Sequence, residues 1–338
     1  KQKTAYEMRN NAISDMMEPG STFKTASIMV ALEDGYITPH TTVDTGNGVK
    51  MMHGSAMRDH NWARGGYGVI DVTRILEVSS NVGVSSLIDQ YYKDDPQKFV
   101  DGLKRMSIGV PLGLQISGEG KPNVRGPKER YFAKTTLPWM SIGYETQIPP
   151  INILTFYNAI ANNGKMVKPK FVREVVKDGQ VVESFPTEVI NPKICSDKTL
   201  AEIREILGKV VSEGLAKPAG SKQFQVAGKT GTAQISQGAA GYHANRRYLV
   251  SFCGFFPADA PKYSKIAERV YAKNLHYDMR HAKDSTSNVI PAVKSGQLGE
   301  TYYVLNHLDV PMEHTSVARS HAEEWGKAKQ DSTAVAFE

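Results

Sequence analysis

Ser21 and Lys24 have the clearest capacity for nucleophilic chemistry in this sequence, because they are spaced three residues apart in the run Ser21-Thr22-Phe23-Lys24. On a helix this spacing places both side chains on one face, within reach of each other. Serine becomes a nucleophile when a neighbouring base takes its proton, and lysine can be that base where burial or nearby positive charge lowers its pKa towards neutrality. At a helix N-terminus, Ser21 would also lie beside free N–H groups that stabilise an oxyanion. This spacing arises about once by chance in such a chain, so a capping serine beside a solvated lysine is the commoner explanation of the pair alone.

Two further motifs follow this pair. Ser79-Ser80-Asn81 has the form SxN and Lys229-Thr230-Gly231 the form KTG, and each form occurs only once. A tripeptide such as KTG is expected by chance in about one chain in ten of this length. Each motif has a local alternative, since the first could end a helix and the second could lie on an exposed edge strand. The order SxxK, SxN, KTG is nevertheless the motif triple of penicillin-binding proteins and class A β-lactamases.

With these motifs the chain resembles the transpeptidase domain of class B penicillin-binding proteins, and most closely their septal, cell-division branch. These are monofunctional enzymes that cross-link the cell wall. The resemblance covers roughly residues 5–275 and extends to the segments around the motifs, namely Glu18-Pro19-Gly20, Val43-Asp44-Thr45-Gly46-Asn47-Gly48, Ser79-Ser80-Asn81-Val82-Gly83, Ser141-Ile142-Gly143-Tyr144 and Lys229-Thr230-Gly231-Thr232-Ala233. It implies an α+β fold in which an antiparallel sheet is flanked by helices, with a mostly helical subdomain.

The resemblance also implies a role for each catalytic residue. Ser21 would attack the penultimate D-alanine of a stem peptide ending in D-Ala-D-Ala, and Lys24 would accept the serine proton. Ser79 would relay a proton to the leaving amine, and Asn81 would hold Lys24 and the substrate amide. Lys229 would add a positive field.

The KTG segment is implied to bind substrate through Thr230, Gly231 and Thr232, the two threonine hydroxyls taking the substrate carboxylate. The backbone N–H groups of Ser21 and Thr232 would form the oxyanion hole. An amine from a neighbouring stem peptide would then attack the acyl-enzyme and complete the cross-link. β-Lactam antibiotics resemble D-Ala-D-Ala and would acylate Ser21, and the reaction needs no metal or organic cofactor.

Two other functions remain open from the sequence. A D,D-carboxypeptidase or a β-lactamase would use the same residues with water in place of the amine, although no ExxxN element typical of class A β-lactamases is evident. A penicillin-binding sensor or scaffold would keep the same three motifs without turnover.

The pattern of apolar residues and of Gly, Pro and capping residues predicts an α+β arrangement. We expect 41–68 and 109–137 to be irregular. Expected helices cover roughly 21–35, 72–79, 82–92, 96–107, 150–161, 198–213 and 265–273, and expected strands cover 171–176, 180–185, 225–233 and 248–256.

The length of 338 residues suits one large domain with a tail, and 40% hydrophobic residues are enough for a core. We expect a transpeptidase domain over 1–276 and an extension of unknown role over 277–338. Compared with the family, strands are expected to be missing at the N-terminus and near 264–265.

Charge and cysteine content exclude other classes. The net charge of +6 is dispersed along the chain, which argues against nucleic-acid binding. The two cysteines, Cys195 and Cys253, have no metal-ligand spacing, and Cys253 is expected to be a packed thiol. His40, His53 and His60 share one loop-rich region, but no carboxylate or cysteine pattern beside them supports a metal site.

No stretch is apolar enough to span a membrane, so we expect any anchor to lie upstream of this chain. The resemblance implies a catalytic domain in the periplasm, attached to the inner membrane. It further implies a lipid-II-polymerising glycosyltransferase and other division proteins as partners.

Overall fold

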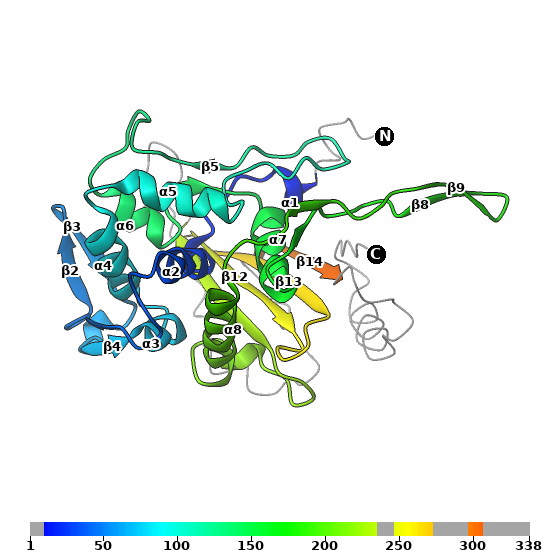
Figure 1. Ribbon diagram of the computed structural model, residues 1–338. Helices are drawn as coiled ribbons and strands as arrows, with labels where there is room; N and C mark the ends of the chain where they lie inside the picture. The colour runs from blue at the N-terminus through cyan, green and yellow to red at the C-terminus, as the bar shows by residue number, and fades with distance from the viewer. Residues whose placement is uncertain (1–9, 235–246, 273–296, 307–338) are drawn as a thin grey trace.

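The structure, a computed structural model, describes residues 10–234, 247–272 and 297–306. A four-stranded antiparallel sheet with the order β11-β12-β13-β14 lies behind a layer of helices (Figure 1). Its strands are β11 (Ala227–Gln234), β12 (Arg247–Phe256), β13 (Tyr263–Ala272) and β14 (Gln297–Asn306). The α+β expectation is confirmed.

The helix expected over 265–273 is wrong, because residues 265–272 form most of β13. Each residue from Tyr263 to Ala272 is paired with one of β12. The apolar spacing of this segment suits a helix as well as a strand, and pairing with the open edge of β12 satisfies its backbone N–H and C=O groups. A strand therefore occupies the junction near 264–265 where one was expected to be missing, and β14 adds another beyond residue 276. The strand expected to be missing at the N-terminus falls outside the described residues, and the domain division at residue 276 stays a prediction.

The helix that follows Ser21 lies at the centre of the molecule. A short 3-10 turn, η2 (Gly20–Thr22), leads into α2 (Lys24–Glu33). Phe23, Ala26, Val30 and Ala31, whose spacing suits the inner face of a helix, are buried, and every other α2 residue up to Leu32 is buried as well. The helix has no solvent face because it lies among α4, α5 and α8 and joins η2, which contacts β11.

The helical region at the left of Figure 1 holds the second motif. Asp71 caps α3 by accepting a hydrogen bond from Arg74 N (2.7 Å), at the start of the helix expected over 72–79. The Ser80 side chain caps α4 in the same way through Gly83 N (2.8 Å). The helices of this region are α3 (Val72–Glu77), α4 (Asn81–Tyr92), α5 (Pro96–Arg105) and α6 (Thr136–Ser141).

The segment expected to be irregular over 41–68 contains short strand pairs. These are β1 (Thr42–Asp44) with β4 (Val69–Asp71) and β2 (Val49–Met52) with β3 (Ser55–Arg58), followed by η3 (Trp62–Arg64). Other short elements are α1 (Asn11–Ser14), β5 (Asn123–Val124), β6 (Thr146–Gln147), β7 (Met166–Val167), β10 (Val189–Asn191) and η4 (Lys217–Ala219).

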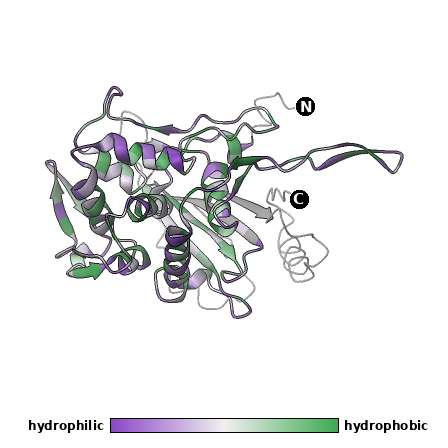
Figure 2. Ribbon diagram, viewed as in Figure 1, coloured by the Kyte–Doolittle hydropathy of each residue, from purple (hydrophilic) through white to green (hydrophobic). Residues whose placement is uncertain are grey.

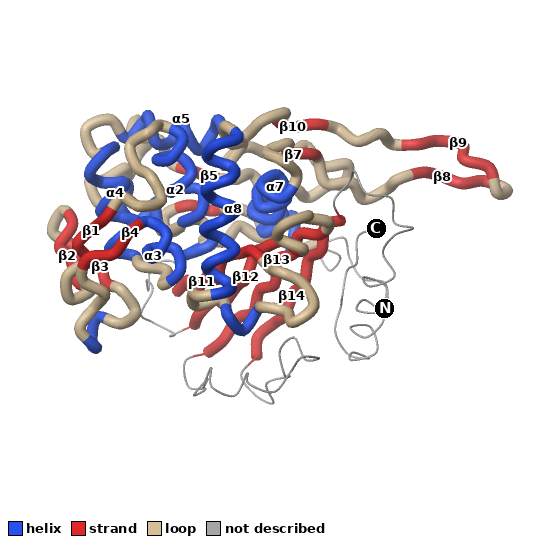
Figure 3. The backbone as a smooth tube through the Cα atoms, turned by 60° about the horizontal axis from the view of Figure 1, so that its bottom comes forward, coloured by secondary structure: helices blue, strands red, loops and turns tan. Residues whose placement is uncertain are grey.

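Two long helices cover the sheet. α7 (Pro150–Ala161) contacts β12, β13 and β14, and α8 (Asp197–Ser212) contacts β11, as Figure 3 shows from a second direction. Asn158 on α7 accepts a hydrogen bond from the Ser264 hydroxyl of β13 (2.7 Å). This contact fixes the helix against the middle of the sheet.

The expected hairpin is formed by β8 (Glu174–Lys177) and β9 (Gln180–Ser184) and projects from the body of the molecule (Figures 1 and 2). Asp178 and Gly179 both have positive φ, 53° and 77°, as a tight hairpin turn requires. Hydrophobic stretches lie along both strands in Figure 2. No helix in the described part of the chain is long and apolar enough to cross a membrane.

Candidate active site

Lys24 joins the first two motifs directly. Its Nζ donates hydrogen bonds to Asn81 Oδ1 (2.7 Å) and to the backbone oxygen of Ser79 (2.6 Å), and lies 3.2 Å from Ser79 Oγ. Ser79 has a left-handed φ of 54°, which is strained for a residue with a side chain and turns the SxN motif around the amino group. The folded chain therefore brings together residues 55 and 57 positions apart.

Burial disfavours the charged form of Lys24. Its side chain is fully buried, and desolvation lowers its pKa to about 7, against an opposing effect of the Asp59 carboxylate. A neutral amine has two N–H groups and one lone pair. The two N–H groups match the oxygens of Asn81 and Ser79, which leaves the lone pair available to accept a proton from a hydroxyl.

Ser21 lies in the 3-10 turn η2, immediately before Lys24 begins α2, and is half-buried. Among the described residues no hydrogen bond joins Ser21 Oγ to Lys24, whose amino group is bonded to the SxN motif. The turn is held from below by Tyr157, whose hydroxyl donates to Thr22 O (2.9 Å) and lies 2.7 Å from Thr25 Oγ1. It is held from the side by Gly143, whose O accepts from Gly20 N (3.1 Å).

Strand β11 lies directly against the Ser21 turn. A Cβ placed on Gly20 would lie 3.4 Å from Thr232 O, and a Cβ on Gly231 would lie 3.4 Å from Pro19 O. The backbones of η2 and of β11 are thus in van der Waals contact at the level of Thr232. The two N–H groups expected to form the oxyanion hole, those of Ser21 and Thr232, belong to these two adjoining segments.

The KTG residues alternate in burial along β11, as strand geometry requires. Lys229 and Gly231 are buried, whereas Thr230 is half-buried and Thr232 exposed. Desolvation, and secondly the positive charge of Lys24, lowers the pKa of Lys229 well below its usual range. The Lys229 amino group donates to Thr230 O (3.0 Å).

Sequence reasoning missed Asp59. Its carboxylate is 1% exposed and accepts hydrogen bonds from Ser80 Oγ (2.8 Å) and Val82 N (2.9 Å). The neighbouring Arg58 O accepts from Asn81 Nδ2 (2.8 Å). No pattern in the sequence marks Asp59, because an aspartate in a polar loop is ordinarily solvated.

The histidines of this region do not converge. His53 Nε2 lies 2.8 Å from Asp89 Oδ1 and His60 Nε2 lies 2.9 Å from the Tyr67 hydroxyl. No group of three or more His, Cys, Asp or Glu side chains suited to a metal occurs within the described ranges. The side chains of Cys195 and Cys253 are both buried.

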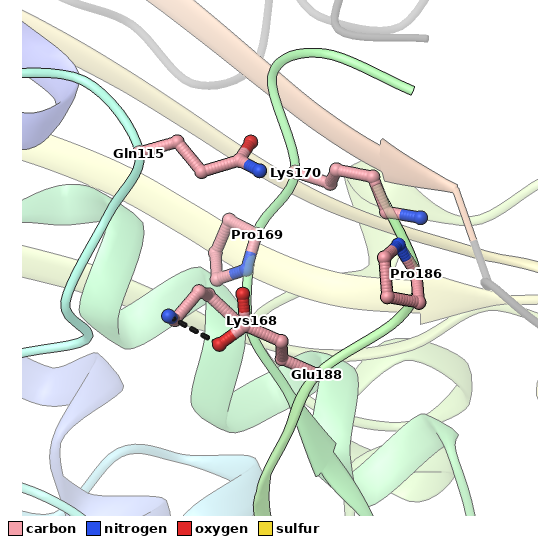
Figure 4. A pocket seen from close by; sticks show the side chains of 6 residues that line it. All are labelled: Gln115, Lys168, Pro169, Lys170, Pro186 and Glu188. Carbon is pink, nitrogen blue, oxygen red and sulfur yellow. Dashed lines mark hydrogen bonds and ion pairs between the residues drawn. The ribbon is translucent and has the colours of Figure 1, made fainter. Parts of the chain in front are cut away.

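A shallow depression at the base of the β8–β9 hairpin lies apart from these motifs (Figure 4). Its walls come from six residues, Gln115, Lys168, Pro169, Lys170, Pro186 and Glu188. Lys168 is paired with Glu188 (2.5 Å) and Lys170 donates to Phe185 O (2.8 Å), so both cations are already bound. None of the motif residues lines it, and it does not serve the chemistry of Ser21.

The penicillin binding protein transpeptidase domain family matches residues 1–288, and the chain belongs to that family. The expected resemblance is thereby confirmed. The chain is 27% identical to penicillin-binding protein PbpB of Mycolicibacterium smegmatis, over 76% of this chain and 39% of the relative. It is 28% identical to peptidoglycan D,D-transpeptidase FtsI of Buchnera aphidicola, over 76% of this chain and 41% of the relative.

Solved structures show the same fold. Penicillin-binding protein 3 of Mycobacterium tuberculosis, complexed with aztreonam, superposes with a TM-score of 0.67 at 28% identity, over 77% of this chain and 58% of that chain. This chain spans about two fifths of the length of the curated relatives named above.

Proposed function

We propose that this chain is the catalytic domain of a peptidoglycan D,D-transpeptidase that works through an acyl-enzyme on Ser21. The observation that carries the proposal is the contact of a fully buried Lys24 with Asn81 and Ser79, next to the turn that holds Ser21. Relatives named peptidoglycan D,D-transpeptidase support the same reaction.

In the first half-reaction Ser21 Oγ attacks the carbonyl carbon of the penultimate D-alanine. Neutral Lys24 accepts the hydroxyl proton, and the N–H groups of Ser21 and Thr232 stabilise the oxyanion. The peptide bond to the terminal D-alanine then breaks, and its amine takes a proton through Ser79, whose Oγ lies 3.2 Å from Lys24 Nζ. Lys24 is left neutral at the end of this half-reaction and can act again in the second.

The KTG strand recognises the substrate. Thr232 and Thr230 offer hydroxyls to the terminal carboxylate, and the buried Lys229 supplies a positive field beneath them. Glycine at position 231 allows Ser251 to lie close to the β11 backbone, because a Cβ there would lie 2.2 Å from Ser251 Oγ.

An amine of a second stem peptide resolves the acyl-enzyme in preference to water. A class A β-lactamase hydrolyses its acyl-enzyme with a water that a carboxylate activates. Asp59 is saturated by Ser80 and Val82, and Glu145 accepts from Thr136 (2.8 Å) and pairs with Arg125 (3.8 Å). These engaged carboxylates favour a transpeptidase over a β-lactamase, and they favour a persistent adduct with β-lactams.

We place this reaction in septal wall synthesis, on the basis of the resemblance to the cell-division branch. Its substrate is assembled outside the cytoplasmic membrane. The domain would therefore work in the periplasm, as part of a protein attached to the inner membrane. A lipid-II-polymerising glycosyltransferase and other division proteins would be its partners.

Incubation with uncross-linked peptidoglycan strands tests the proposal. We expect cross-linked dimers and one D-alanine released per cross-link, detected by mass spectrometry, with neither product from Ser21→Ala. Shortened stem peptides without dimers would assign a D,D-carboxypeptidase instead. Penicillin labelling without either product would assign a sensor or scaffold.

A further inference from the structure

Asp59 lies beneath the SxN motif as a buried carboxylate with a fixed position. Its own N–H donates to Gly48 O (2.9 Å), and its carboxylate accepts from Ser80 Oγ and Val82 N at the start of α4. No ion pair within 4 Å links it to Lys24 in the described part of the chain. Any influence on Lys24 is therefore exerted through space and through the turn that both contact.

The backbone of Arg58, the residue before Asp59, also contacts the turn. Arg58 O accepts from Asn81 Nδ2, which orients the amide so that its Oδ1 faces Lys24. The segment 58–59 thus contacts two successive residues of the motif, Ser80 and Asn81. This opposes relaxation of the strained backbone at Ser79.

We propose that Asp59 is a positioning residue for acylation, which holds the Ser79–Asn81 turn around Lys24 and presents a buried carboxylate to this turn. This inference rests on the proposed function of Lys24 as the base. It assigns a role to a loop residue outside the three motifs.

Asp59 acts on Lys24 together with the other ionisable groups around it. Lys24 faces Ser79 and Asn81 at the start of α4, and the ionisable groups that act with it are Lys229 on β11 and Asp59 and His60 in the loop after β3. Asp59 is the carboxylate among them. Burial lowers the pKa of Lys24 and Asp59 opposes that effect, so the two together place this pKa at about 7.

Removing the charge should therefore lower the pKa of Lys24 further. Lys24 would become neutral at a lower pH, but it would also be a weaker base, so acylation would be slower on the plateau. An opposite charge near a buried group moves its pKa by about one unit or more.

Acylation by a fluorescent penicillin, followed between pH 5 and 9, tests this inference. In wild type we expect a rate that rises with pH through about pH 7. In Asp59→Asn, and in Asp59→Ser as a second neutral variant, we expect this rise to move by about one unit towards lower pH, with a slower plateau. Ser80→Ala removes the hydroxyl partner but keeps the carboxylate, so its midpoint should stay within a few tenths of a pH unit of wild type.

Failure of the role of Asp59 and failure of the proposed function give different results. An unmoved midpoint in folded Asp59→Asn, or loss of fold in both neutral variants, would reduce Asp59 to a structural residue and overturn the inference. A midpoint that vanishes in His60→Gln would assign the titration to His60 and overturn it as well. Absence of labelling at Ser21 in wild type would instead contradict the proposed function.

Discussion

At the level of single residues, the proposed chemistry depends on one lysine, Lys24, which is buried without a carboxylate in direct contact. Lys24 has hydrogen-bond partners for two N–H groups in Asn81 and Ser79, and a pKa of about 7. A lysine in such a site functions as a base because the protein disfavours its charged form. The same burial has a cost in stability.

Lys24→Arg should abolish acylation although it keeps a positive charge. A guanidinium does not lose its proton in a protein and is larger than an ammonium group. We expect the rate of labelling by fluorescent penicillin to fall by at least about two orders of magnitude, the usual contribution of a positioned base. Lys98→Arg, at an exposed site on α5, is the matched control and should react at the wild-type rate. A rate for Lys24→Arg within threefold of wild type would leave Lys24 as an electrostatic neighbour only.

The lowered pKa of Lys24 should also appear in the pH dependence of the free energy of unfolding. Because the folded-state pKa of Lys24 lies below its unfolded value, the folded state loses stability as pH falls from about 10 to about 7. Lys24→Met removes this titration. The free energy of unfolding of wild type relative to Lys24→Met should therefore increase by roughly 2 kcal/mol between pH 6.5 and 8.5, measured by urea denaturation. A difference that does not change with pH would show that Lys24 titrates near its usual pKa.

At the scale of elements, the Ser21 turn is held between β11, α7 and the segment after α6. Gly143 has a φ of 84°, and a Cβ there would lie 2.1 Å from Gly20 O. No side chain fits between these two backbones. The loop after α6 therefore fixes the turn that carries Ser21, the proposed nucleophile.

Gly143→Ala should displace this turn. We expect slower acylation and a loss of about 2 kcal/mol or more in unfolding free energy, from overpacking combined with backbone strain. Gly54→Ala is the matched control, because Gly54 has a similar φ of 87° with nothing within 4 Å of a Cβ. It should lose only about 1 kcal/mol and keep the wild-type acylation rate. Equal acylation rates in the two variants would refute the role of Gly143.

Local signals predicted the elements whose ends are marked in the sequence. Asp71 caps its helix, and Asp178-Gly179 forms the hairpin turn. The cap that Ser80 forms at the start of α4 was not predicted, because Ser79-Ser80-Asn81 was taken as the end of the preceding helix. The segment 265–273 was mistaken for a helix because a short apolar pattern is compatible with the repeat of a helix and with that of a strand. Pairing with the edge of β12, which the sequence does not reveal, makes it a strand. Asp59 went unpredicted for a similar reason, since its burial depends on contacts with Ser80 and Val82 across the fold.

At the level of the whole molecule, the three motifs lie on two helices and one strand that converge at the candidate active site. α2 carries Lys24, the start of α4 carries Asn81, and the edge strand β11 carries Lys229. The order of the motifs could be predicted from the sequence, and their convergence follows from the family. The burial of Lys24 and Lys229, which makes the chemistry possible, depends on the assembled core and is visible only in the structure.

The central claim is that Ser21 forms a stable acyl-enzyme. Intact-mass spectrometry of the chain after incubation with penicillin, followed by peptide mapping, tests it most directly. We predict a single adduct of the whole antibiotic on Ser21 that persists for hours, and no adduct on Ser21→Ala. An adduct on another serine, or one lost within seconds while penicillin is steadily hydrolysed, would contradict the account.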